Sequence, residues 1–347
     1  MINKQIQFDF NDLIIEPEVI TNINTRKNIN VRKNNMLPLM TAPMDTVINN
    51  ENSNIYENLG IIPILTRVKN THNNYVSTGK FLSYSLTQVE DVFLKNAQII
   101  YSKPYKVLID VANGHMKNVL DISKKLKEVY GDNIKLMVGN IANPITIDEY
   151  CKLKVDYVRC GIGGGSSCTS TANVAVGGSL AYIINEAYKI RNKFHTPKTQ
   201  IIADGGIKSY ADAIKALALG ADYVMLGGIL NKSLESCAIT KKENDEIIDQ
   251  YSDEAKKMFL AGVPLYKEFR GMSTKDVQRS LGKEILTTSE GIVTKNKVEY
   301  LLETWVENFE DYLKSAMSYT NKDNLHDFKG KVNLNLVSEN YFKRYNK

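Results

Sequence analysis

The residues best suited to chemistry are concentrated in one stretch, VRCGIGGGSSCTSTANVAVGG, which runs from Val158 to Gly178. Its glycines let the backbone approach a ligand closely and adopt positive φ angles, and its hydroxyl groups add hydrogen-bonding atoms. Cys168 directly follows the glycine and serine run. A cysteine in this position is either a small buried residue or a nucleophile whose thiolate is stabilised by backbone N–H groups. The stretch alone leaves both interpretations open.

Eight apolar, β-rich runs indicate the strands that position this loop. They cover residues 36–42, 61–66, 81–86, 106–112, 134–140, 156–161, 199–206 and 222–228. Near-continuous apolar runs are typical of parallel strands buried on both faces. Amphipathic patterns predict helices over 119–130, 179–194 and 209–220. Eight strand–helix units predict an α/β fold of the (β/α)8 TIM barrel type, with a doubly wound sheet as the alternative.

The carboxyl ends of the predicted strands carry polar residues and glycines. In a barrel these ends converge on one face, where active sites lie, and the last two loops often bind phosphate. Here those loops hold Asp204-Gly205-Gly206 and Gly227-Gly228. Backbone N–H groups of such glycines can bind phosphate, and Asp204 can accept hydrogen bonds from ribose hydroxyls. The plainer alternatives are turn glycines and a helix-capping aspartate.

Composition excludes several classes of function. The chain has 347 residues, of which 43% are hydrophobic and 24% are charged, as in ordinary soluble globular proteins. No apolar run is long enough to cross a membrane, and the first residues lack the apolar core of a signal peptide. The four cysteines form neither a disulfide framework nor a zinc pattern. We therefore expect a cytoplasmic protein with no membrane partner. Its +5 charge is spread out, which also argues against a nucleic-acid partner.

The pattern loosens after the last predicted strand. Residues 231–300 are polar and are predicted to form a mobile flap over the barrel mouth. Residues 298–317 indicate a closing helix, and the basic tail at 320–347 is expected either to pack on a neighbouring subunit or to be partly disordered. No stretch is long enough for an inserted regulatory domain, so residues 1–347 are interpreted as one barrel domain.

An ordered set of motifs resembles the IMP dehydrogenase/GMP reductase family over nearly the whole chain. The set comprises APMDTV (42–47), DVANGH (110–115), GNI (139–141), GIGGGSSCT (161–169), ADGGI (203–207), VMLGG (224–228), GMS (271–273) and EG (290–291). The resemblance implies an oxidoreductase that acts on a purine nucleoside monophosphate with a nicotinamide cofactor, NADPH or NADH. It also implies a homo-oligomer, with a tetramer as the family's usual state.

The resemblance assigns roles to individual residues. Cys168 is the nucleophile that attacks purine C2, and Ser170 and Glu290 complete the catalytic group. The substrate-binding residues are Ser166, Asp204, Gly205, Gly206, Gly227, Gly228, Arg270, Gly271, Met272 and Ser273. Asp110, Asn113 and Gly114 lie where the cofactor binds. Backbone carbonyls of Gly163, Gly165 and Cys168 correspond to a monovalent-cation site, suited to K⁺.

Three features favour the reductase branch, which converts GMP to IMP and ammonia. The dehydrogenase branch uses an Arg-Tyr pair on its flap, but here Arg279 is followed by Ser280. The segment from Thr274 to Ser289 is short, and DVANG resembles the reductase motif more than the DSSHG of dehydrogenases.

Several positions depart from the family pattern. GPGS is replaced by GGGS at 163–166, and Arg67 stands where a lysine is expected. Phe269-Arg270 stands where reductases have a tyrosine, so Arg270 is a candidate phosphate ligand. Three alternatives therefore stay open: an IMP dehydrogenase, an enzyme for a related nucleotide such as dGMP, and an inactive nucleotide-binding barrel.

Overall fold

A parallel eight-stranded sheet forms the centre of the molecule. The computed structural model describes residues 6–67, 79–95, 104–165, 170–195, 198–282, 288 and 291–345. The strands of the sheet are β2 (Leu39–Thr41), β3 (Ile64–Leu65), β4 (Phe81–Tyr84), β5 (Tyr105–Asp110), β6 (Ile134–Ile141), β7 (Tyr157–Cys160), β8 (Gln200–Asp204) and β9 (Tyr223–Leu226). Their order is β2-β9-β8-β7-β6-β5-β4-β3, and every pairing within it is parallel. All eight strands match predicted runs.

The sheet closes on itself beside β2. The Thr41 N–H donates to the Ile62 carbonyl at 3.0 Å, and the Ile62 N–H donates to the Leu39 carbonyl at 2.9 Å. Along each strand, side chains alternate between two buried clusters. Met40, Leu108 and Met137 belong to the smaller cluster, while their chain neighbours belong to the larger one that packs under the helices. This closure confirms the predicted (β/α)8 barrel and excludes the open doubly wound sheet.

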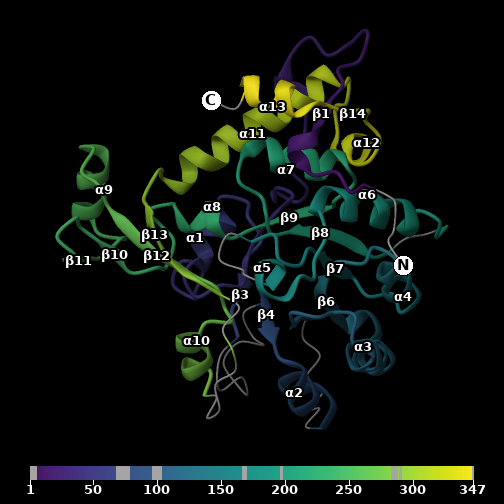
Figure 1. Ribbon diagram of the computed structural model, residues 1–347, viewed down its shortest axis with the longest axis horizontal. Helices are drawn as coiled ribbons and strands as arrows, with labels where there is room; N and C mark the ends of the chain where they lie inside the picture. The colour runs from purple at the N-terminus through teal and green to yellow at the C-terminus, as the bar shows by residue number, and fades with distance from the viewer. Residues whose placement is uncertain are drawn as a thin grey trace.

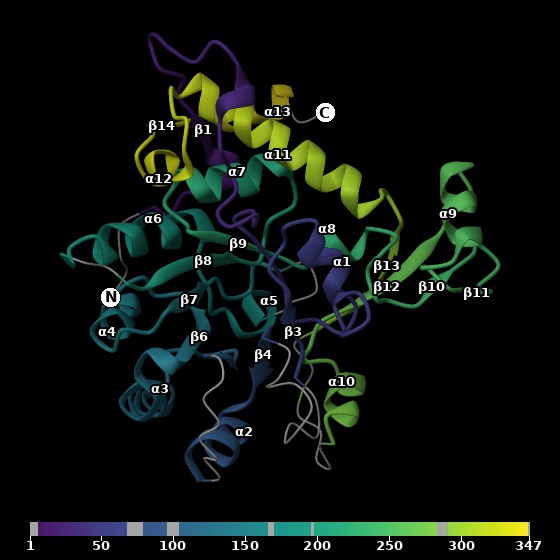
Figure 2. The ribbon, with the colours of Figure 1, turned by 180° about the vertical axis from the view of Figure 1, so that it is seen from behind.

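Helices surround the barrel (Figures 1 and 2). The described helices are α1 (Ser53–Asn58), α2 (Leu86–Val89), α3 (Lys117–Tyr130), α4 (Thr146–Lys152), α5 (Ser170–Val174), α6 (Leu180–Arg191), α7 (Tyr210–Ala218), α8 (Gly228–Asn231), α9 (Asp253–Leu260), α10 (Lys275–Ser280), α11 (Leu302–Tyr319), α12 (Leu325–Phe328) and α13 (Glu339–Tyr345). Of these, α9 lies on a projecting lobe and not against the barrel (Figures 1 and 2). In α3, buried Val119, Ile122 and Leu126 recur at helical spacing, as the sequence pattern predicts. No described helix is both long and apolar enough to cross a membrane.

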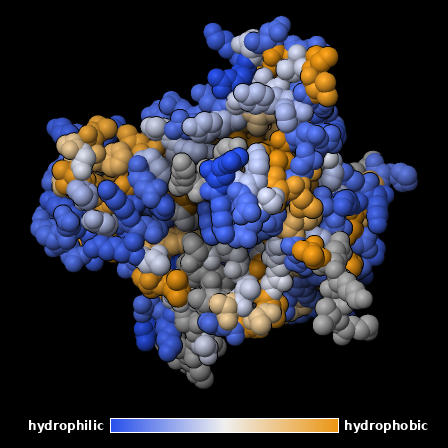
Figure 3. Space-filling view, turned by 45° about the horizontal axis from the view of Figure 1, so that its top comes forward, coloured by the Kyte–Doolittle hydropathy of each residue, from blue (hydrophilic) through white to orange (hydrophobic). Residues whose placement is uncertain are grey.

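The segment predicted as a flap contains a second, antiparallel sheet. Its strands run in the order β11 (Ile247–Ile248), β10 (Thr240–Lys241), β12 (Tyr266–Arg270) and β13 (Val293–Lys297). Leu234, Ile248 and Leu265 anchor a small core between this sheet and α9. The resulting lobe projects from the barrel, at the left of Figure 1, and apolar side chains gather on its outer surface (Figure 3). Regular structure was not anticipated here; mobility of the segment stays a prediction.

A buried lysine holds the lobe together from inside. The Lys267 side chain lies on the inner face of β12 and is only 1% exposed. Its Nζ donates to the Leu234 carbonyl at 2.8 Å, the Ser236 carbonyl at 2.6 Å and Ser236 Oγ at 2.9 Å. Burial lowers the pKa of Lys267 to about 7, against a smaller opposing effect of Cys237 and Glu235.

We expect Lys267→Met to remove a pH dependence of stability. An unfolded lysine has a pKa of about 10.4, so above pH 7 the unfolded chain binds more protons than the folded one. The wild-type free energy of unfolding should therefore gain roughly 1 kcal/mol per pH unit relative to the variant between pH 7 and pH 9. Denaturant unfolding of both proteins at several pH values measures this difference. Lys257→Met, at an exposed position on α9, is the matched control. If the difference in unfolding free energy between wild type and Lys267→Met stays constant with pH, the lowered pKa of Lys267 is wrong.

The C-terminal segment packs on its own barrel. Strand β14 (Leu334–Leu336) pairs antiparallel with β1 (Leu13–Ile15), and α11 contacts α7. The Gly330 N–H donates to the Ala218 carbonyl at 3.0 Å, which fixes the tail beside the end of α7. Residues 320–345 therefore pack on the barrel of their own chain. The two alternatives expected from the sequence, packing on a neighbouring subunit and partial disorder, did not include this arrangement.

Candidate active site

Two adjoining cavities lie over the carboxyl ends of the barrel strands. The first, of about 330 Å³, is lined by the loops after β8 and β9 and by Phe269. The second, of about 420 Å³, extends over β5, β6 and β7 to the segment 271–273. Both are lined by Gly165, Asp204 and Gly205. The shared wall means that ligands in the two cavities would lie side by side.

The first cavity gathers the predicted phosphate-binding residues. Gly205, Gly206, Gly227 and Gly228 all line it, as the sequence predicts for phosphate loops. Gly206 has a φ of +73°, a conformation that side chains rarely adopt, and a Cβ there would lie 3.2 Å from the Gly164 carbonyl oxygen. The loop after β8 therefore needs glycine both for its turn and for its close approach to Gly164.

A buried arginine connects the two cavities. Arg159 lies on β7, and its Nη1 contacts Asp110 Oδ1 at 2.8 Å while its Nη2 contacts Asp204 Oδ2 at 2.8 Å. All three side chains are no more than 15% exposed. Burial alone would lower the pKa of Arg159, but the two carboxylates outweigh it and raise the pKa above its ordinary value. The guanidinium therefore stays charged and links the predicted ribose ligand to the predicted cofactor ligand.

Neighbouring residues make room for this arginine and complete its network. A Cβ on Gly139, the residue paired with Arg159 across β6 and β7, would lie 2.4 Å from the Arg159 Cβ. Asn140 Nδ2 donates to Asp204 Oδ2 at 2.7 Å, and Arg67 Nε lies 3.4 Å from Asp110 Oδ2. Two guanidinium groups thus face two carboxylates, so the buried charges balance.

Asp204 keeps one oxygen available for a ligand. Every hydrogen bond and ion pair that its side chain makes to described residues involves Oδ2, which leaves Oδ1 without a partner among them. The alternative role as a helix cap is wrong, because the cap of α7 is Ser209, whose Oγ accepts from the Asp212 N–H at 3.2 Å. Asp204 therefore uses one carboxylate oxygen to contact the protein, and its other oxygen is available to a ligand in the cavities that Asp204 lines.

Comparison with known proteins decides the family. A profile of the IMP dehydrogenase / GMP reductase domain matches residues 7–344. The chain belongs to this family. It is 28% identical over 313 residues to a GMP reductase of Buchnera aphidicola subsp. Baizongia pistaciae, which covers 84% of this chain and 88% of that protein. A GMP reductase of Enterobacter sp. is 28% identical over 305 residues, covering 79% of this chain and 84% of its own.

A dehydrogenase is also among the relatives. Inosine-5'-monophosphate dehydrogenase of Chlorobaculum parvum is 32% identical over 223 residues, covering 64% of this chain and 43% of that protein. Both names denote oxidoreductases, so the family to which the chain belongs is one of oxidoreductases.

The predicted cofactor turn is held firmly against β6. Asn113 Oδ1 accepts from the His115 N–H at 3.1 Å, and the Gly114 N–H donates to the Asn140 carbonyl at 2.7 Å. His115 Nδ1 lies 2.8 Å from Thr146 Oγ1, and its Nε2 accepts from the backbone beyond β6. Burial lowers the pKa of His115. Asp110 lines the second cavity, whereas Asn113 and Gly114 do not.

Arg270 is engaged away from both cavities. Its Nη2 contacts Asp45 Oδ2 at 2.6 Å and its Nε contacts Asp45 Oδ1 at 3.3 Å, a two-point contact with one carboxylate. Neither cavity is lined by Arg270, although Gly271, Met272 and Ser273 line the second. Lys208, which the sequence analysis did not single out, lines the first cavity and supplies a cation there. Phosphate contact by Arg270 stays a prediction.

Part of the catalytic group lies outside the described residues. Ser166, Cys168, Glu290 and the side chain of Ser170 are among these, so their predicted roles stay predictions. Their described neighbours belong to the site: Gly165 lines both cavities. A Cβ on Gly291 would lie 3.1 Å from Ser273 Oγ, on the wall of the second cavity.

The described cysteines are poor nucleophiles. Cys151 and Cys160 are buried and Cys237 is partly buried. Burial raises the pKa of all three thiols, and that of Cys237 reaches about 12. A thiol with a raised pKa carries almost no thiolate at neutral pH. None of the cysteines that the structure describes is therefore suited to act as a nucleophile, and Cys168 stays the candidate on the grounds given by the sequence.

Proposed function

We propose that this protein is an NADPH-dependent reductase that converts GMP, or a closely related purine nucleotide such as dGMP, to the hypoxanthine nucleotide. The balanced reaction is GMP + NADPH + 2 H⁺ → IMP + NADP⁺ + NH₄⁺. The observation that carries the proposal is the pair of adjoining cavities joined by Asp110, Arg159 and Asp204. One cavity suits a nucleoside monophosphate, and the other suits the nicotinamide half of a cofactor beside it.

The substrate would lie with its phosphate on the glycine loops of the first cavity. Gly206, Gly227 and Gly228 offer backbone N–H groups, and Lys208 offers a positive charge. A ribose hydroxyl can donate to the remaining oxygen of Asp204. This orientation directs the purine into the second cavity, toward the segments 163–165 and 271–273 that line it.

The chemical step would use a covalent adduct on Cys168. Its thiolate adds to purine C2, and Glu290 and Ser170 would deliver a proton to the amino group, which then leaves as ammonia. The C–S bond forms first, and the C–N bond breaks when the protonated amine leaves, which gives a thioimidate. NADPH would supply the hydride that replaces sulfur at C2 and returns the thiolate. Gly163 and Gly165, with Cys168, would hold a monovalent cation through carbonyl oxygens; among described residues no carboxylate, imidazole or thiol cluster could bind a metal instead.

The second cavity has features that fit a nicotinamide cofactor. Its lining includes Asp110, Val111 and Ala112, together with the two arginines Arg67 and Arg159. These provide a polar, largely ordered edge for an amide and ribose and a positive field for phosphate oxygens. The charges of Arg67 and Arg159 are shared with Asp110, so only part of this field is available to the ligand.

The IMP dehydrogenase reaction is the second candidate, because one relative carries that name. Against it, Arg279 extends from the exposed face of α10 and pairs with Asp276 at 2.8 Å, with side chains 62% and 65% exposed. A group that must activate water for hydrolysis of the adduct needs to reach the reacting carbon. Arg279 is placed outside the cavity lining and has no tyrosine beside it.

Two assays with the purified protein separate these reactions. The first follows NADPH consumption and ammonia release with GMP and, separately, with dGMP. The second follows NADH formation from IMP and NAD⁺. Activity in the first assay is expected, with ammonia and oxidised cofactor formed one to one. Activity in the second assay alone overturns the reductase proposal, and silence of both with every nucleotide points to the inactive nucleotide-binding barrel. Sedimentation of the same sample tests the homotetramer that the family resemblance implies.

A further inference from the structure

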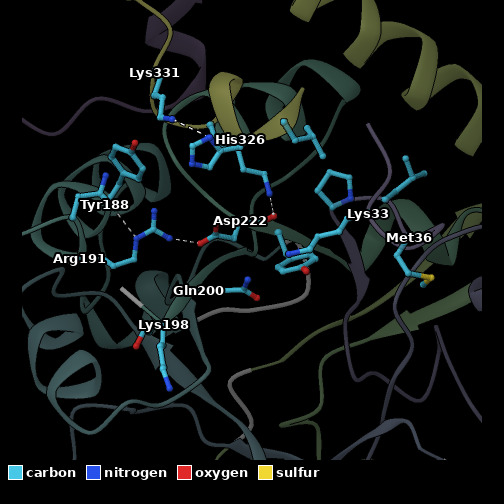
Figure 4. A pocket seen from close by; sticks show the side chains of 16 residues that line it. Lys33, Met36, Tyr188, Arg191, Lys198, Gln200, Asp222, His326 and Lys331 are labelled. Carbon is cyan, nitrogen blue, oxygen red and sulfur yellow. Dashed lines mark hydrogen bonds and ion pairs between the residues drawn. The ribbon is translucent and has the colours of Figure 1, made fainter. Parts of the chain in front are cut away.

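A third cavity opens at the opposite end of the barrel from the candidate active site. It has a volume of about 420 Å³ and lies at the amino ends of β8 and β9, beside Gln200 and Asp222. Figure 4 shows its lining residues, which come from the segment before β2, from α6, from the strand ends, and from α12 and the segment after it. Asp204 and Gly227 lie at the other ends of the same strands, so the two sites are separated by the barrel.

The charges around this third cavity are strongly unbalanced. Its cationic lining residues are Lys33, Arg191, Lys198, Lys329 and Lys331. Asp222 is the only carboxylate among the lining residues that the structure describes. Asp222 Oδ2 is already in contact with Arg191 Nη1 and accepts from the Ile201 N–H at 2.8 Å. Lys331 Nζ lies 3.2 Å from Asp327 Oδ1, outside the lining. Three lining cations, Lys33, Lys198 and Lys329, therefore have no carboxylate at ion-pair distance among the described residues.

Lys329 is the least exposed lysine of this group. Its Nζ donates to the backbone carbonyl of Asp222 at 2.6 Å and lies 5.5 Å from the centre of the Tyr223 ring. Burial lowers the pKa of Lys329; Asp222 opposes this effect, while Arg191 and Lys33 add to it. An anion bound here would remove the repulsion among these cations.

The backbone carrying Lys329 and Lys331 is fixed in place. Gly330, between them, has a φ of +66°, and a Cβ at this position would lie 2.2 Å from the Tyr188 ring. Tyr188 in turn stacks on the Arg191 guanidinium, whose carbon lies 5.1 Å from the ring centre. This packing distinguishes the cavity from a patch of freely moving surface lysines, because the cations from the tail and from α6 are held around one volume.

A neighbouring cavity could accommodate a longer ligand. It has a volume of about 530 Å³, shares Lys198 and Gln200 with the third cavity, and adds Lys154. Its other two lysines, Lys127 and Lys135, are both paired with Asp156, at 2.9 Å and 3.1 Å. Lys198 therefore stands where an extended anion would pass from one cavity to the next.

We propose that the third cavity binds a small phosphate-chain compound, such as inorganic tripolyphosphate or the triphosphate group of a nucleotide. Cavities of this size hold small molecules, and lysine and arginine side chains from several segments can contact successive phosphate groups. The site is distinct from the two cavities of the candidate active site and does not depend on the reaction proposed there.

Calorimetric titration of the full-length protein tests the proposal, with tripolyphosphate and ATP as separate probes and no divalent cation. Wild type should bind tripolyphosphate. The Lys33→Ala/Lys198→Ala double variant, in which both positions are exposed, should bind it about tenfold or more weakly, as should Lys329→Met. Equal binding of both probes identifies the phosphate chain as the recognised group, and tighter binding of ATP identifies a nucleotide.

Two controls fix the place of binding. The Lys33→Arg/Lys198→Arg variant keeps the charges and should retain wild-type affinity. Lys208→Ala removes a cation from the candidate active site and should leave this binding event unchanged. Absence of binding to wild type overturns the proposal. So does an affinity that falls in Lys208→Ala but not in the Lys33→Ala/Lys198→Ala variant, because the anion would then lie at the other end of the barrel.

Discussion

Cys168→Ala should lower turnover with GMP by at least about a thousandfold, because removing a covalent nucleophile removes the route to the adduct itself. Nucleotide binding should stay close to wild type, since the phosphate loops and Asp204 are unchanged. Cys168→Ser should fail as well, because a serine hydroxyl is far less acidic than a thiol and forms little of the attacking anion at neutral pH.

The measurements are NADPH consumption for turnover and calorimetry for GMP binding. Cys237→Ala is the matched control: it makes the same change at a thiol that burial keeps protonated, and it should retain most activity. If Cys168→Ala turns over GMP at the wild-type rate, the covalent mechanism is wrong for this protein. If GMP does not bind to wild type at all, the choice of substrate fails before the mechanism is tested.

The barrel was predictable because parallel strands buried on both faces have no polar side to interrupt their apolar runs. Stretches such as 106–112 and 134–140 coincide with β5 and β6 almost to the residue. The small sheet of the lobe was not predictable in the same way. Its strand β12 directs Lys267 inward beside Phe269, so the inner face does not read as apolar. The burial of a lysine depends on carbonyl partners at 234 and 236, which the local sequence does not reveal.

The candidate site, like the fold, could be predicted only in part from the sequence. Asp110, Asp204 and the glycine pairs could be singled out because each follows directly after a predicted strand. The role of Arg159 could not, because it depends on the strand order that puts β7 between β6 and β8. The one local signal was an arginine within an otherwise apolar strand, next to Cys160. Gly139 is a second indication of the buried arginine, because a side chain at this position would collide with Arg159. It could not be used from the sequence alone, since the pairing of Gly139 with Arg159 is known only from the structure.

Arg159→Met should lower both stability and activity. It leaves Asp110 and Asp204 buried without their shared guanidinium, and breaking a buried ion pair in this way typically costs about 3–5 kcal/mol of unfolding free energy. Arg67 and Asn140 each keep one contact to these carboxylates, which places the expected loss near the lower end of that range, about 3 kcal/mol. Denaturant unfolding measures the loss, and the GMP assay at low temperature measures activity of the folded fraction.

A variant with restored charge balance separates the two roles of the network. Arg159→Met/Asp204→Asn removes one cation together with one anion and leaves Arg67 paired with Asp110, so no uncompensated charge remains at the centre of the site. Replacing a buried ion pair by neutral residues is often nearly neutral for stability, so this protein should recover most of the lost unfolding free energy. Its activity should not recover, because Asp204 would no longer present an anionic oxygen to the ribose. Recovery of both would mean that the network serves only the fold, and an Arg159→Met protein as stable as wild type would mean that Arg67 and Asn140 already suffice to hold the two carboxylates.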